Sequence, residues 1–144
     1  LELTPLLVDS LYTEAMLLAD EARACFDRSF DAGHLSPEIS VAFSCESLKV
    51  TTRLMHSIAW LLNQKALRAG EITESEARNE TNNLGYAPAS DGPLVLQFPP
   101  ETQALISASE ELYGRLQRLS EKMRATVPQA SEPHAMRDRL RASF

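Results

Sequence analysis

The chain is poor in the residues that build phosphate-binding loops, disulfide scaffolds and membrane spans. Its 144 residues include 5 glycines and 2 cysteines. The glycines are too widely spaced for a Gly-x-Gly-x-x-Gly, Walker or Gly-x-Ser-x-Gly motif. The longest uncharged stretch near the middle, 54–64, is far shorter than the roughly 20 residues of a membrane helix. These absences exclude a dinucleotide or P-loop fold and a membrane span, and they argue against an enzyme.

Basic residues are also scarce, with 14 Lys and Arg against 20 Asp and Glu and a formal net charge of −6. Nucleic-acid-binding proteins normally display clustered positive charge, so this balance argues against such a partner. A basic cluster at Arg115, Arg118, Lys122 and Arg124 keeps that alternative open. No charged leader followed by an apolar block opens the chain, so we expect a cytoplasmic protein without membrane association.

Few residues have the spacing of a catalytic or metal site. Cys25 and Cys45 lie far outside C-x-x-C spacing and on apolar stripes, which predicts buried, reduced thiols. His34, His56 and His134 all lack the glutamate three positions earlier that a di-metal helical bundle uses. We therefore predict no catalytic residue, no cofactor and no metal ligand.

Apolar or small residues instead recur at alternating spacings of three and four, which is typical of helices packed on one face. The first helix is predicted from about Pro5 to Phe30. Ser36-Pro37-Glu38 then provides an N-cap, a first-turn proline and an acid near the positive dipole end. The second helix should run to a stop at Gly70, a rod of roughly 50 Å. The stripe of the first helix is Val8, Leu11, Ala15, Leu18, Ala22, Cys25 and Ser29.

The second helix carries two apolar bands, and we expect both to be covered. On this view Leu62→Asp would bury an unpaired carboxylate and unfold or dissociate the protein. The main stripe is Val41, Cys45, Leu48, Thr52, Met55, Ala59, Leu62 and Ala66, and the additional band is Val50, Leu54, Ile58 and Leu61.

The second half of the chain predicts three further elements. Thr73 to Glu76 has capping-box spacing, which indicates a short helix to about Asn82. Residues 83–100 are rich in Gly and Pro, so an ordered loop laid over the bundle is expected, with a short edge strand as the alternative. A last helix should run from Pro100 to about Thr126 on the stripe Leu105, Ser109, Leu112, Leu116, Leu119 and Met123.

The predicted fold is therefore all-α: an elongated antiparallel three-helix bundle with a short extra helix. Residues 1–127 would form the bundle domain, and residues 128–144 a flexible C-terminal tail. The additional band on the second helix would leave a large apolar patch on a monomer, which favours pairing of two copies about a two-fold axis.

Glu46, Lys49, Arg53, His56 and Trp60 follow one another at spacings of three or four and share one face of the second helix. An ion pair, a guanidinium fork and an indole beside a cation are typical of interface hot spots. A structural network or an ordinary solvated face explains them as well. The predicted partner or dimer contacts are Glu46, Lys49, Val50, Arg53, Leu54, Ile58, Trp60 and Leu61, with possible tail contacts at Arg137, Arg139 and Arg141.

One stretch of the second helix resembles the bacterial RcdA-like family, named for the regulator of CtrA degradation. It comprises Glu46-Ser47-Leu48-Lys49-Val50-Thr51-Thr52-Arg53-Leu54-Met55, then Ala59-Trp60-Leu61-Leu62 and Gly70-Glu71-Ile72-Thr73. The first helix is similar through Leu11-Tyr12-Thr13-Glu14-Ala15-Met16 and Glu21-Ala22-Arg23. The resemblance implies a homodimeric three-helix bundle without enzymatic activity. It also implies an adaptor that helps deliver substrates such as the response regulator CtrA to the protease ClpXP, together with other accessory factors.

Other functions stay open on the sequence alone. A dimerisation module of a regulatory complex without a proteolytic role would have the same helical pattern. A helical carrier of a metal or small molecule is less favoured, because the ligand spacings are missing.

Overall fold

The computed structural model describes residues 4–32, 36–78 and 83–125. The chain forms α1 (Pro5–Ala32), α2 (Pro37–Arg68), α3 (Glu74–Ala77), α4 (Gly92–Val95) and α5 (Pro100–Ala125). These ranges contain no strand, which confirms the all-α prediction. The tail predicted for 128–144 lies outside the described residues. None of the described helices has both the length and the apolar character needed to cross a membrane.

The ends of the helices follow the signals in the sequence. The Ser36 hydroxyl accepts a hydrogen bond from the Ile39 amide, so Ser36 caps α2. Thr73 caps α3 by accepting from the Glu76 amide at 3.1 Å. Gly70, just beyond α2, has φ of 76°, a left-handed conformation that glycine adopts without strain. The predicted bounds of the long helices are therefore confirmed to within two residues.

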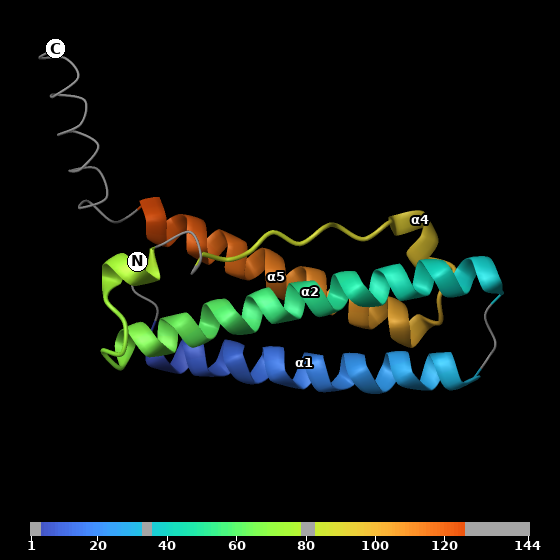
Figure 1. The fold of residues 1–144 in the computed structure, drawn as a ribbon, viewed down its shortest axis with the longest axis horizontal. Helices are drawn as coiled ribbons and strands as arrows, with labels where there is room; N and C mark the ends of the chain where they lie inside the picture. The colour runs from blue at the N-terminus through green and yellow to red at the C-terminus, as the bar shows by residue number, and fades with distance from the viewer. Residues whose placement is uncertain (1–3, 33–35, 79–82, 126–144) are drawn as a thin grey trace, which may run out of the picture.

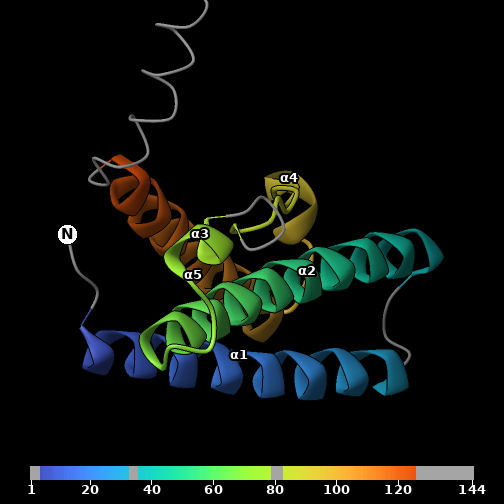
Figure 2. The same cartoon turned by 60° about the vertical axis from the view of Figure 1, so that its left-hand side comes forward.

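The three long helices form the bundle, with α1 and α2 side by side in opposite directions along its length (Figure 1). α5 packs against both helices. The turned view shows that its axis is inclined to those of α1 and α2 (Figure 2). The connection between α3 and α5 runs back along α2 and α5 (Figure 1). We call residues 84–98 of this connection the strap.

The core lies where α1, α2 and α5 meet. The stripe on α1 from Val8 to Cys25 and that on α5 both face inward. Val8, Ala15, Leu112 and Leu116 are among the side chains with no exposed surface. Phe43 of α2 packs edge-to-face on Phe26 of α1 and on Phe98 at the end of the strap, with ring centroids 5.1 and 5.4 Å apart. The strap therefore contributes a side chain to the same core as the helices.

The orientation predicted for α2 is wrong. Val41, Leu48 and Met55 of the main stripe are 65–67% exposed, and Leu62 is 46% exposed. The additional band faces the core instead: Val50, Leu54 and Leu61 are buried, and Ile58 is partly buried. A carboxylate at position 62 would thus remain at the surface, so the predicted unfolding of Leu62→Asp does not follow.

Three smaller predictions also change. Cys25 is buried as expected, but Cys45 is exposed because it belongs to the outward stripe of α2. The loop predicted over 83–100 is present, yet it contains the helical turn α4, where Asp91 accepts from the Leu94 amide and Pro93 fits the first turn. α3 is shorter than predicted, and residues 79–82 lie outside the described part of the chain.

Candidate functional site: the two faces of α2

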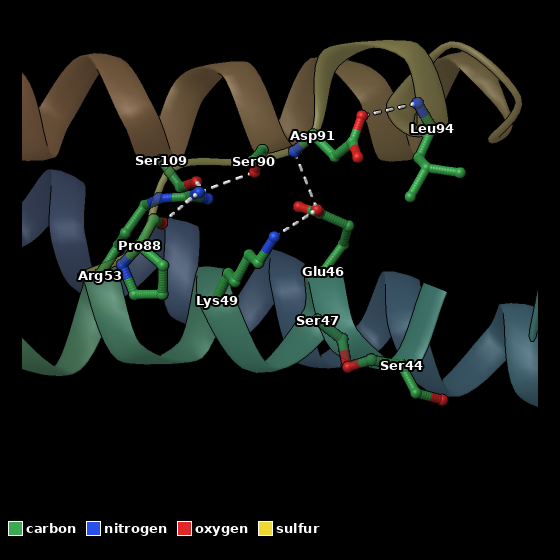
Figure 3. Close-up of polar contacts among 10 residues, drawn as sticks. All are labelled: Ser44, Glu46, Ser47, Lys49, Arg53, Pro88, Ser90, Asp91, Leu94 and Ser109. Carbon is green, nitrogen blue, oxygen red and sulfur yellow. Dashed lines mark hydrogen bonds and ion pairs between the residues drawn. The ribbon is translucent and has the colours of Figure 1, made fainter. Parts of the chain in front are cut away.

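A buried arginine ties the strap to the bundle. The Arg53 side chain on α2 is fully enclosed, at 2% exposure. Its Nη2 donates to the Pro88 carbonyl at 3.0 Å and to the Ser90 hydroxyl at 2.7 Å, while Nη1 donates to the Ser109 hydroxyl of α5 at 3.3 Å (Figure 3). One guanidinium therefore joins α2, the strap and α5, because its fork carries several donors in a fixed plane.

A buried glutamate earlier on α2 makes the second connection. Glu46 is 1% exposed, and its Oε1 accepts from Lys49 Nζ at 3.0 Å and from the Asp91 amide at 3.1 Å (Figure 3). Asp91 is also the N-cap of α4. The predicted Glu46–Lys49 pair is confirmed. The hydrogen bond from the Asp91 amide to Glu46 holds the start of α4 over α2.

The pKa values of these groups follow from burial opposed by local contacts. Burial raises the pKa of Glu46, but contacts with the Ser90 hydroxyl, the Asp91 amide and Lys49 outweigh it, so this pKa lies below its ordinary value of 4.5. Burial lowers the pKa of Arg53, partly offset by the charges of Glu110 and Glu46. Both groups are therefore ionised at neutral pH and hold the strap by charge-assisted hydrogen bonds.

The beginning of the strap approaches α2 and α5 closely. The Tyr113 hydroxyl of α5 donates to the Gly85 carbonyl, and burial raises the pKa of Tyr113. A Cβ at position 85 would overlap the imidazole ring of His56. A side chain at this position would force the imidazole or the strap to shift, and glycine avoids this overlap.

The predicted contact residues of α2 mostly lie inside one chain. Trp60 is 4% exposed within the core, and no cation–π contact is found for it among the described residues. The cation–π contact that is present places Lys65 Nζ 4.4 Å from the Tyr12 ring centroid. The apolar band that suggested an exposed patch is covered by α1, α5 and the strap. Arg137, Arg139 and Arg141 lie outside the described residues.

The opposite face of α2 is the surface that the sequence analysis assigned to the core. Every α2 residue from 41 to 62 that is classed as exposed is uncharged: Val41, Cys45, Leu48, Thr51, Met55, Ala59 and Leu62. A chain with 24% charged residues normally covers such a long helix face with charge. Exposed apolar surface that extends along a helix in this way is typical of sites that contact other molecules.

A groove lies between α1 and α5. It has a volume of about 450 Å³ and is lined by Leu18, Ala24, Leu105 and Ala108 among others, with the Arg28–Glu101 ion pair at 2.5 Å across one end. Among the described residues, no group of His, Cys, Asp or Glu side chains converges as a metal site would.

Comparison with known proteins links this architecture to a protein family and to a solved structure of the same fold. The model of the family DUF1465, described as a protein of unknown function, matches residues 2–144. The crystal structure of RcdA from Caulobacter crescentus superposes with a TM-score of 0.68 at 31% sequence identity. The match covers 83% of this chain and 93% of that one. No curated protein matches the chain. The predicted resemblance to the RcdA-like family is confirmed.

Proposed function

Because the chain belongs to the DUF1465 family and has the fold of RcdA, we propose that it is an adaptor without enzymatic activity. In this role it binds regulatory substrates and helps deliver them to the protease ClpXP, working as a homodimer in the cytoplasm with other accessory factors. The observation that carries the proposal is the match to RcdA over 93% of that chain, since the shared fold extends across the whole bundle rather than one helix pair.

The two faces of α2 support an adaptor in physical terms. Two polar groups that could do chemistry, Glu46 and Arg53, are withdrawn from solvent and hold the strap, and Lys49 pairs with Glu46. The exposed surface of the same helix is apolar and uncharged from Val41 to Leu62. A protein that assembles other proteins needs such a surface, whereas an enzyme needs polar groups open to a substrate.

The test is the decay of a CtrA-type response regulator in reactions containing ClpXP and the accessory factors. We expect faster decay when the protein is added, and a loss of that acceleration when the chain is cut after Thr126. Full-length protein carrying Arg23→Ala, a change at an exposed residue of α1, serves as the control for substitution as such. Equal decay in all reactions would exclude the adaptor role.

A second candidate is a dimerisation module of a regulatory complex without a proteolytic role. The uncharged face of α2 favours it as much as an adaptor, since both require protein contact. Affinity capture from the native cell separates the two. Recovery of protease subunits supports the adaptor, and recovery of regulators alone supports the module.

A further inference from the structure

The outward face of α2 has a regular alternation of large and small side chains. We call this row the outer seam: Val41, Cys45, Leu48, Thr52, Met55, Ala59, Leu62 and Ala66. Spacings of four and three alternate along it, so it repeats every seven residues as a coiled-coil seam does. In each repeat one position carries a large apolar side chain, and the other carries Cys, Thr or Ala.

That alternation fits a copy of itself running in the opposite direction. If the two-fold axis passes between Thr52 and Met55, each large side chain faces a small one across the interface. Leu62 then faces Cys45 of the partner subunit, and Leu48 faces Ala59 of the partner subunit. Met55 faces Thr52 of the partner subunit, and Val41 faces Ala66 of the partner subunit.

A parallel, in-register pair fits poorly. It would stack large side chains on large ones and small on small, so that bulky layers keep the helices apart while the layers between them hold voids. The antiparallel register fills every layer evenly, and small residues in each layer let the two backbones approach closely.

We propose that the outer seam is a self-association surface on which a second copy of the chain packs antiparallel, with the two-fold axis between Thr52 and Met55. This rests on the homodimer in the proposed function and deepens it by assigning its surface and register. The absence of charge between Val41 and Leu62 among the exposed residues of α2 supports a second copy as the occupant. A charged partner segment would lose hydration there without gaining an ion pair, whereas the copy presents an equally uncharged face.

The flanks of the seam are compatible with this pairing. Lys49 and Lys65 are the basic residues beside it, and each already contacts an acid of its own chain, Glu46 at 3.0 Å and Asp9 at 3.4 Å. The seam from Val41 to Ala66 is about 38 Å long at 1.5 Å per residue. A single helix face is smaller than the ~800 Å² per partner of a standard interface, so we expect association in the micromolar range.

The register can be tested with a native thiol. In Leu62→Cys the new thiol faces Cys45 of the partner subunit, so mild oxidation with diamide should link most of the chains into covalent dimers. Cys45 and position 62 of one chain are about 25 Å apart along the helix, so no disulfide can form within a chain. Position 62 is half exposed, and the fold should tolerate the change.

Two controls define the result. The wild type should stay uncrosslinked, because antiparallel pairing puts the two Cys45 thiols about 25 Å apart. Leu62→Cys combined with Cys45→Ser should also stay uncrosslinked, and peptide mass mapping should identify a link between Cys45 and the thiol introduced at position 62. Covalent dimers of the wild type would indicate parallel pairing, and no crosslink in Leu62→Cys would reject the register.

Analytical ultracentrifugation tests whether the outer seam carries the association. Protein concentrations of about 1–100 µM bracket the expected micromolar dissociation constant. We expect dimers for the wild type and at least a tenfold weaker association for Met55→Glu, with unchanged helicity by circular dichroism. A monomeric wild type, or dimers that Met55→Glu leaves intact, would overturn the proposal. Association lost only on cutting after Thr126 would overturn it as well and identify the tail as the occupant. Because none of these measurements contains a protease, they can fail while the adaptor role holds.

Discussion

The inner and outer faces of α2 reverse the usual distribution of polar and apolar side chains. The inner face buries Glu46 and Arg53 at 1% and 2% exposure. The outer face leaves Leu48 and Met55 at 67% and 65% exposure. The difference shows that burial here depends on what each face meets. The inner face meets a strap that offers hydrogen-bond partners, and the outer face meets no other part of the described chain.

Buried charge of this kind positions the strap more than it adds stability. Removing the charged groups of Glu46 and Arg53 from water costs free energy. The hydrogen bonds to Pro88, Ser90 and Asp91 offset this cost only when the strap occupies its observed position. The network thus specifies where residues 84–98 pack. Apolar contact by Phe98 holds the other end in the core.

Adjacent residues of α2 allow the sharpest test of this comparison. Leu54 is 3% exposed and Met55 is 65% exposed, so the same change can be made on each face. Leu54→Glu should lower the free energy of unfolding by about 4 kcal/mol or more, because an unpaired carboxylate enters the core. Met55→Glu should change it by no more than ~0.5 kcal/mol when measured on the monomer, as exposed substitutions usually do. Urea unfolding followed by circular dichroism checks both, and similar losses in the two variants would contradict the assignment of faces.

Removal of the guanidinium should have the next largest effect. Arg53→Ala leaves the Pro88 carbonyl and two hydroxyl groups without their donor and creates a cavity, so we expect a loss of about 3 kcal/mol. Limited proteolysis should then cut the strap before it cuts the helices. Arg23→Ala, whose side chain is 78% exposed, should change neither measurement.

The close approach of the strap to His56 predicts a smaller effect. Gly85→Ala places a methyl group against the imidazole ring, so His56 or the strap must shift, at a cost of about 2 kcal/mol. Gly92→Ala is the matched control, since a Cβ at position 92 has no heavy atom within 4 Å. Thermal unfolding of the two variants gives the comparison, and a melting temperature for Gly85→Ala equal to the wild type would refute the contact.

The smallest effect concerns pH. The pKa of Glu46 is lower in the folded chain than its ordinary value of 4.5, so the folded state binds the proton less tightly than the unfolded state. The stability that this carboxylate contributes is therefore complete above about pH 4.5 and is lost as the pH falls through the folded pKa. Glu46→Gln should reduce stability at pH 7 by about 1 kcal/mol, the order of a single hydrogen bond. It should also flatten the acid limb of the stability profile below the ordinary pKa of 4.5. An acid limb as steep as that of the wild type would show that other carboxyl groups dominate.

Much of the fold follows from local signals along the chain. Ser36, Thr73 and Gly70 mark helix ends through capping and backbone conformation, which depend on neighbouring residues alone. The stripes of α1 and α5 were predicted correctly because each of these helices has one clear apolar side. α4 was missed because its turn depends on Asp91 and Pro93 within a segment whose composition favours loops.

The candidate site could be predicted only in part. The sequence analysis placed Glu46, Lys49 and Arg53 on one face of a helix, and the Glu46–Lys49 pair is observed. Their partners on the strap lie 35 to 45 residues away in the chain, and no local pattern announces a contact over that separation. Periodicity likewise showed two apolar bands on α2 but not which band faces inward.

The sequence by itself determined the three long helices, their ends and the two bands of α2, because these depend on capping, propensity and spacing within a few residues. The tertiary structure decided which band is buried. A face with Glu46 and Arg53 can enter the core only if another segment supplies donors and acceptors for them, and the strap does so after the chain has folded back over α2. The outward band stays exposed because the described segments that cover α2 pack on its inner face.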